Sequence, residues 1–270
     1  MQGKIAMAGR RAIGVFDSGV GGLSVLRHIH QHLPHEPLLY IADSQYMPYG
    51  CKPASAVQAR CMALASFLDK RHCKAMVVAC NTATAAAVQE LRAQYQFPVI
   101  GMEPAVKPAV RQSTSRVVGV LVTSGTAASE KFNRLASRFS QQARLIVQPC
   151  PGLVERIEAG DLASEQTRRL LLSLLRPLMH QGMDTLVLGC THYPFITPLI
   201  RALIGDDIAI IDSGDAIARE LERQLQRQYA LSGHQYPAFI EFWSSGNTQT
   251  VAPVLSHLWG EQIILNRLAL

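Results

Sequence analysis

The chain has 270 residues, of which 48% are hydrophobic and 17% charged, with a formal net charge of +6. This composition excludes a disordered chain and a disulfide scaffold, and the length predicts one large or two modest α/β domains. No apolar run approaches the roughly 20 residues of a membrane helix, and residues 1–10 lack the apolar core of a signal peptide. We therefore expect a cytoplasmic protein that does not bind membranes.

The six cysteines are expected to be reduced thiols, because cytoplasmic proteins rarely carry disulfides. They show no C-x-x-C spacing and the histidines form no H-E-x-x-H pattern, so no metal site is expected. Lys and Arg are scattered along the chain, which argues against nucleic-acid binding. The positive charge instead favours a small anionic substrate.

Short apolar runs alternate with helical patterns along the chain, which is typical of βαβ units and a mainly parallel sheet. The predicted strands are 12–16, 38–42, 75–79, 98–102, 117–121, 145–149, 185–189, 208–212 and 239–243. Between the second and third strands, apolar residues share one face of a helix predicted over 53–71. Cys61 lies on that face and is expected in the core.

A weak internal repeat divides the chain into two related halves. IGVFDSG at 13–19 resembles VGVLVTS at 118–124, and AMVVACNT at 75–82 resembles DTLVLGCTH at 184–192. The repeat predicts two pseudo-symmetric α/β domains, each a mainly parallel sheet flanked by helices, with the active site in the cleft between them. We place the first domain at 1–104 plus 215–270 and the second at 105–214.

Each half offers one cysteine at the carboxyl end of an apolar strand. Polar residues follow both thiols: Cys80 precedes Asn81 and Thr82, and Cys190 precedes Thr191 and His192. Helices predicted to start near 84 and 194 bring backbone N–H groups that favour a thiolate. A buried cysteine can also be a plain small hydrophobe, but two at matching positions with polar neighbours indicate an acid and a base.

The glycine-rich segment DSGVGG at 17–22 follows the first strand. It lacks the glycine order and the lysine of nucleotide-binding loops. Asp17 either binds a substrate ammonium or caps the helix expected over 19–32, and the glycines let the backbone approach a ligand. Other strand-end loops offer Glu103, Cys150 and Glu155 as cleft residues, although an ordinary loop role explains them as well.

Five motifs together closely resemble the glutamate racemases of the Asp/Glu racemase superfamily. They are DSGVGG at 17–22, PYG at 48–50, VVACNTAT at 77–84, GMEPA at 101–105 and LGCTHYP at 188–194. The resemblance implies an isomerase that interconverts L- and D-glutamate for peptidoglycan synthesis and cell wall biogenesis. It implies no pyridoxal phosphate or other cofactor.

The resemblance also implies roles for individual residues. Cys80 would take the α-proton of D-glutamate and Cys190 that of L-glutamate, assisted by Asp17 and His192 respectively. The substrate would be held by Asp17, Ser18, Tyr49, Gly50, Asn81, Thr82, Thr191 and His192, with Glu155 nearby. An activating peptidoglycan precursor and a homodimer are left open, as are the roles of Cys51 and Cys150.

Inverting a stereocentre without an electron-sink cofactor requires a base on one face of the substrate and a proton donor on the other. Two thiols meet this requirement symmetrically, which agrees with the resemblance. Two alternatives remain: a racemase of another amino acid such as aspartate, because the two-base device is indifferent to side-chain length, and a non-catalytic binder or regulatory protein of the same fold.

Overall fold

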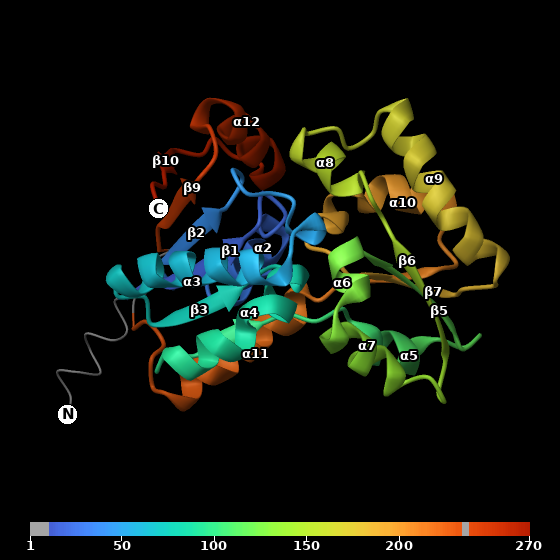
Figure 1. The fold of residues 1–270 in the computed structure, drawn as a ribbon, viewed down its shortest axis with the longest axis horizontal. Coiled ribbons are helices and arrows are strands. Elements are labelled where there is room, and N and C mark those ends of the chain that lie inside the picture. The colour runs from blue at the N-terminus through green and yellow to red at the C-terminus, as the bar shows by residue number, and fades with distance from the viewer. Residues whose placement is uncertain (1–10, 234–237) are drawn as a thin grey trace.

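The structure is a computed structural model, and it describes residues 11–233 and 238–270. Residues 1–10, where no signal peptide is expected, lie outside the described residues. The described chain forms two lobes, each built on its own sheet (Figure 1). Within the described ranges, no helix is long and apolar enough to cross a membrane.

The first sheet has six strands in the order β10-β9-β2-β1-β3-β4. Its strands are β1 (Ile13–Asp17), β2 (Leu38–Ala42), β3 (Ala75–Val78), β4 (Val99–Gly101), β9 (Ile240–Ser244) and β10 (Leu265–Arg267). All neighbouring strands are parallel. The sequence did not predict β10, because this three-residue edge strand is largely exposed and carries no apolar pattern.

The second sheet has four parallel strands in the order β6-β5-β7-β8. They are β5 (Val117–Val122), β6 (Arg144–Pro149), β7 (Thr185–Leu188) and β8 (Ala209–Ile211). Each predicted strand is therefore present within a residue or so of its expected bounds. The predicted fold class, two mainly parallel sheets flanked by helices, is confirmed.

Helices flank both sheets (Figure 1). Beside the first sheet lie α2 (Leu23–His32), the 3-10 turn η1 (Tyr49–Cys51), α3 (Ala54–Lys70), α4 (Asn81–Gln94), α11 (Gly214–Arg227) and α12 (Thr248–Trp259). Beside the second lie α5 (Val106–Gln112), α6 (Ser124–Ala128), α7 (Glu130–Ser137), α8 (Leu153–Glu158), α9 (Glu165–His180), the 3-10 turn η2 (Tyr193–Ile196) and α10 (Thr197–Ile204).

The chain crosses between the sheets after β4 and again after β8. Helix α11, which follows the second crossing, packs against α2 of the first lobe. We therefore retain the division into 1–104 plus 215–270 and 105–214 as the proposed domain limits.

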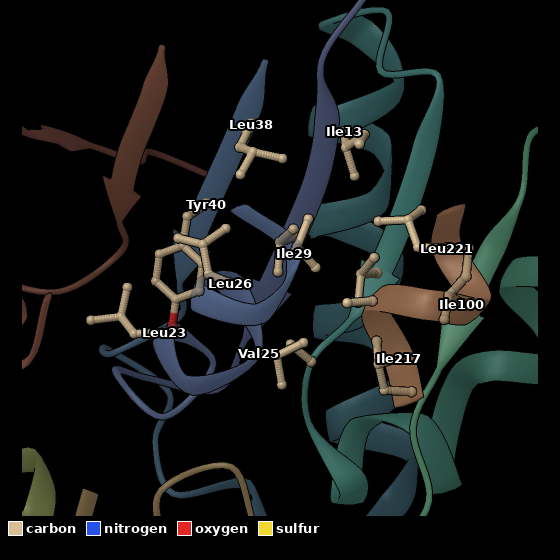
Figure 2. Close-up of a cluster of buried hydrophobic side chains, with 14 of the residues drawn as sticks. Ile13, Leu23, Val25, Leu26, Ile29, Leu38, Tyr40, Ile100, Ile217 and Leu221 are labelled. Carbon is tan, nitrogen blue, oxygen red and sulfur yellow. The ribbon is translucent and has the colours of Figure 1, made fainter. Parts of the chain in front are cut away.

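The inner strands of each sheet are buried and packed on both faces, as is typical of parallel sheets, whereas the edge strands β6, β8 and β10 are only partly buried. In the first sheet, side chains from α2 and α11 pack on one face against Ile13 and Leu38 (Figure 2). Phe16 points to the opposite face, where it packs with Cys61 of α3. Cys61 is fully buried, so its predicted core position is confirmed. This packing holds the carboxyl ends of the strands in fixed positions for the side chains that follow them.

Candidate active site

Both predicted thiols lie two residues beyond a central strand, Cys80 after β3 and Cys190 after β7. They line one shared cavity, and each is only 6% exposed. The other lining residues are Ser18, Pro48, Tyr49, Gly50, Asn81, Thr82, Thr123, Val154, Gly189, Thr191 and His192. The fold therefore brings the cysteine of each sheet to a common space, together with most of the expected substrate-binding residues.

The shared cavity has a volume of about 20 Å³, which is room for about one water molecule. The lobes are thus closed around it, and an amino acid can enter only if they move apart. Cavities of about 720 and 820 Å³ open elsewhere in the described part of the chain, but neither is lined by a thiol. The candidate active site is therefore identified by its two thiols and not by its volume.

The Cys80 sulfur caps the helix that follows it. It accepts a hydrogen bond of 3.4 Å from the Ala83 N–H, so α4 starts at Asn81 rather than near residue 84 as expected. Its thiol lies 3.9 Å from Ser18 Oγ. Burial and the nearby charge of Asp17 raise the pKa of Cys80 well above 9, and the Ala83 N–H offsets only part of this. Cys80 is therefore a neutral thiol in the closed state.

Cys190 belongs to a chain of three groups. Its sulfur lies 3.6 Å from His192 Nδ1, and His192 Nε2 lies 2.7 Å from Glu158 Oε1. Burial lowers the pKa of His192, but its hydrogen bonds to Cys190 and Glu158, together with the negative charges of those two groups, raise the pKa well above 6.5. The imidazole is therefore protonated, which places a positive charge beside the Cys190 sulfur.

Glu158 was not predicted from the sequence, which pointed to Glu155 instead. Glu155 is exposed and does not line the shared cavity among the described residues, so its expected place near the substrate stays a prediction. Glu158 follows the cavity residue Val154 by four positions in α8, and residues four apart share a helix face. The four-residue spacing from Val154 was therefore the sequence signal that could have identified Glu158 as a site residue.

Asp17 ends β1 and is fully buried. Its Oδ1 accepts hydrogen bonds from Ser18 Oγ and the Gly19 N–H, and its Oδ2 accepts one of 2.7 Å from Thr191 Oγ1. Burial raises the pKa of Asp17 above 3.8, opposed by the His192 charge and by the hydrogen bond from Thr191. Helix α2 has Gly22 as its N-cap, so the alternative role of Asp17 as a helix cap is wrong.

Asn81 carries the clearest sign of a missing ligand. Its side chain is buried on the cavity, and neither amide atom has a hydrogen-bond partner among the described residues. Buried polar groups are nearly always paired, so a ligand is expected to complete the two bonds.

Two threonines that the sequence did not suggest join the site from the second lobe. Thr82 Oγ1 lies 3.0 Å from Thr123 Oγ1 and 3.2 Å from Thr126 Oγ1.

Tyr49 lines the cavity as expected, but its hydroxyl donates to Asp43 Oδ2 at 2.6 Å. The Tyr49 hydroxyl is therefore engaged within the first lobe, and its expected part in substrate binding stays a prediction.

The remaining candidates lie away from the shared cavity. Glu103 is exposed and pairs with Lys131, and Cys150 is buried in the core of the second lobe. Cys51 is exposed. Within residues 11–233 and 238–270, no group of three or more His, Cys, Asp or Glu side chains is placed to hold a metal ion.

A doubled parallel α/β fold that brings one buried thiol from each half to a single cavity defines the class of two-cysteine amino-acid racemases. The sequence model of the Asp/Glu/Hydantoin racemase family matches residues 13–221. The chain belongs to this family.

Its relatives agree in sequence and in structure. The chain is 55% identical to a glutamate racemase of Stutzerimonas stutzeri over 94% of its own length and 96% of the relative. It is similar to the crystal structure of glutamate racemase isoform RacE1 from Bacillus anthracis, with 32% identity, a TM-score of 0.88 and coverage of 97% and 98% of the two chains. The Escherichia coli glutamate racemase in complex with L-glutamate and the activator UDP-MurNAc-Ala gives 31% identity, a TM-score of 0.83 and coverage of 96% and 98%.

Proposed function

We propose that the protein is a glutamate racemase that interconverts L- and D-glutamate by proton transfer between two cysteines. The observation that carries this proposal is the placement of Cys80 and Cys190 on one closed cavity, each from a different sheet. Relatives at 55% and 53% identity over more than nine-tenths of the chain, named glutamate racemase, support glutamate as the substrate. The D-glutamate would supply peptidoglycan synthesis in the cytoplasm.

The closed state is poised to act on L-glutamate. Cys190, whose sulfur lies 3.6 Å from His192 Nδ1, acts as the base: as a thiolate it takes the α-proton and becomes a thiol. Cys80, held as a thiol by its raised pKa, then gives its proton to the opposite face of the α-carbon and becomes a thiolate. The product is D-glutamate, and the reverse reaction exchanges the two roles.

The charge that develops on the substrate during proton removal needs hydrogen-bond donors. The unpaired amide of Asn81 and the hydroxyl of Thr82 line the cavity and suit the α-carboxylate. The anionic form of Asp17 suits the substrate ammonium.

The test is exchange of the α-proton with solvent deuterium, together with circular dichroism of L-glutamate during incubation. We expect Cys80→Ala and Cys190→Ala each to abolish racemisation. Full racemisation by either variant would refute the two-base mechanism. If the native protein leaves the optical rotation of L-glutamate unchanged, the result would favour a non-catalytic binder. A kcat/KM that favours aspartate by more than about tenfold, roughly 1.4 kcal/mol, would overturn the choice of substrate.

We also propose an activator site at the crossing between the lobes. A cavity of about 820 Å³ there is lined by five cationic side chains, Arg92, Lys107, Lys131, Arg138 and Arg219, against three anionic ones, Glu103, Asp212 and Asp215. An excess of positive charge suits a diphosphate such as that of UDP-MurNAc-Ala. Activation by this precursor that is lost in Lys107→Gln would support the site, and equal activation of both proteins would reject it. A homodimer stays a prediction.

A further inference from the structure

The glycine-rich loop at 17–22 lies against the groups that assist Cys190, not only beside the substrate space. A Cβ atom at Gly19 would lie 1.7 Å from Glu158 Oε1, and a Cβ atom at Gly21 would lie 2.3 Å from His192 Nδ1. Real Cβ atoms essentially never come within 3.0 Å of a heavy atom outside their own residue and its two chain neighbours. Glycine at these two positions is therefore what admits the two side chains of the other lobe.

The loop also bonds to those groups. The Val20 N–H donates to Glu158 Oε1 at 2.8 Å, the same oxygen that lies 2.7 Å from His192 Nε2. One carboxylate oxygen thus has a partner in each lobe. Because a hydrogen bond to a charged group is stronger than one between neutral groups, this contact fixes the orientation of Glu158.

Further bonds anchor the loop on both sides. Within the first lobe, the Tyr40 hydroxyl donates to the Gly19 carbonyl at 2.6 Å. Across the lobes, Ser24 Oγ donates to the Thr191 carbonyl at 2.8 Å, and Thr191 Oγ1 donates to Asp17. Thr191, the residue between Cys190 and His192, is therefore tied in the closed state to Asp17 of the loop and to Ser24 just beyond it.

We propose that the loop at 17–22 is a cross-domain positioning element that orients the Glu158–His192 pair toward Cys190 when the lobes close. This inference rests on the proposed function. The two bases then differ in how they are prepared. The contacts of the Cys80 sulfur, with Ser18 and the Ala83 N–H, come from its own lobe. Opening the cleft therefore keeps these two contacts of Cys80 but releases Glu158 and His192 from the loop.

The test uses Gly19→Ala and Gly21→Ala, with Gly233→Ala as the matched control because a Cβ there meets nothing within 4 Å. We expect roughly a 10- to 100-fold loss of kcat/KM in the two loop variants and none in the control. Far-ultraviolet circular dichroism and thermal unfolding establish that each variant folds. Ser24→Ala, which removes a cross-lobe bond without adding volume, provides a second route if the bulkier variants do not fold.

Isotope effects separate a positioning role from a merely structural one. If proton transfer at Cys190 becomes slower, the isotope effect of α-deuterated L-glutamate rises, because Cys190 removes that deuteron. The isotope effect of α-deuterated D-glutamate falls, because Cys80 removes the deuteron of that enantiomer and this step then limits the rate less. Gly19→Ala, Gly21→Ala and Ser24→Ala should therefore shift the two isotope effects in the same sense as His192→Asn.

Glu158→Gln completes a double-mutant cycle with Gly19→Ala. If the loop acts through Glu158, the second substitution adds little to the loss caused by the first. Additive losses, equal changes in both isotope effects, or a Gly19→Ala variant with native kcat/KM would overturn the proposal. Failure of the proposed function is a separate outcome, in which the native protein racemises neither enantiomer. The loop would then still be tested by the NMR titration of His192, which Gly21→Ala should shift and Gly233→Ala should not.

Discussion

The hydrogen bond from Thr191 to Asp17 joins the two lobes inside the site, and Thr191→Val removes it with little change in volume. The bond spans 2.7 Å between Thr191 Oγ1 and Asp17 Oδ2, and both side chains are buried. A hydrogen bond to a charged group contributes about 1.5–3 kcal/mol. If the closed state needs this bond, kcat/KM should fall roughly 10- to 150-fold.

The pH dependence provides a second readout of the same substitution. The Thr191 bond lowers the pKa of Asp17, which burial raises. Without that bond the pKa of Asp17 rises further, so a higher pH is needed to ionise it. The acid limb of the pH profile of kcat/KM should therefore move to higher pH in Thr191→Val.

The assay is circular dichroism of L-glutamate across a pH series, and Thr191→Ser, which keeps the hydroxyl, is the control. We expect Thr191→Ser to retain most of the native activity and the native acid limb. A Thr191→Val variant within twofold of native kcat/KM, with an unmoved acid limb, would contradict the assignment of this bond.

Three further predictions follow from other contacts. Glu158→Gln removes the carboxylate charge that raises the pKa of His192, so the alkaline limb of activity should move to lower pH, which a pH series of kcat/KM measures. Lys74→Met removes the partner of the buried Glu36 carboxylate, with which it forms an ion pair at 2.5 Å. The free energy of unfolding, measured with urea, should fall by about 3–5 kcal/mol, and adding Glu36→Gln should restore part of it. Burial raises the pKa of Asp184, but hydrogen bonds from residues 113–115 outweigh it and hold the pKa well below 3.8. Its stabilising effect is present above pH 3.8 and is lost as pH falls below that value, so thermal unfolding of Asp184→Asn should differ from the native protein at neutral pH and converge in strong acid.

Much of the site was predictable because its residues directly follow strands. Asp17, Cys80 and Cys190 stand at or just beyond the ends of apolar runs, and parallel strands bring their carboxyl ends to one edge. The choice between Glu155 and Glu158 was not settled by position in the chain, because both lie in one short helix. Only the packing of α8 shows which carboxylate faces His192.

The sequence by itself determined the alternation of strands and helices and the two thiols at matching strand ends, because apolar periodicity and chain order are local properties. Tertiary structure alone decided which side chains of one lobe form hydrogen bonds with site residues of the other. Val20 and Glu158 are 138 residues apart in the chain, and their hydrogen bond exists only because the lobes close on one another. The same holds for Thr82 with Thr123 and for Asp17 with Thr191, since no local pattern encodes which side chains meet across a closed cleft.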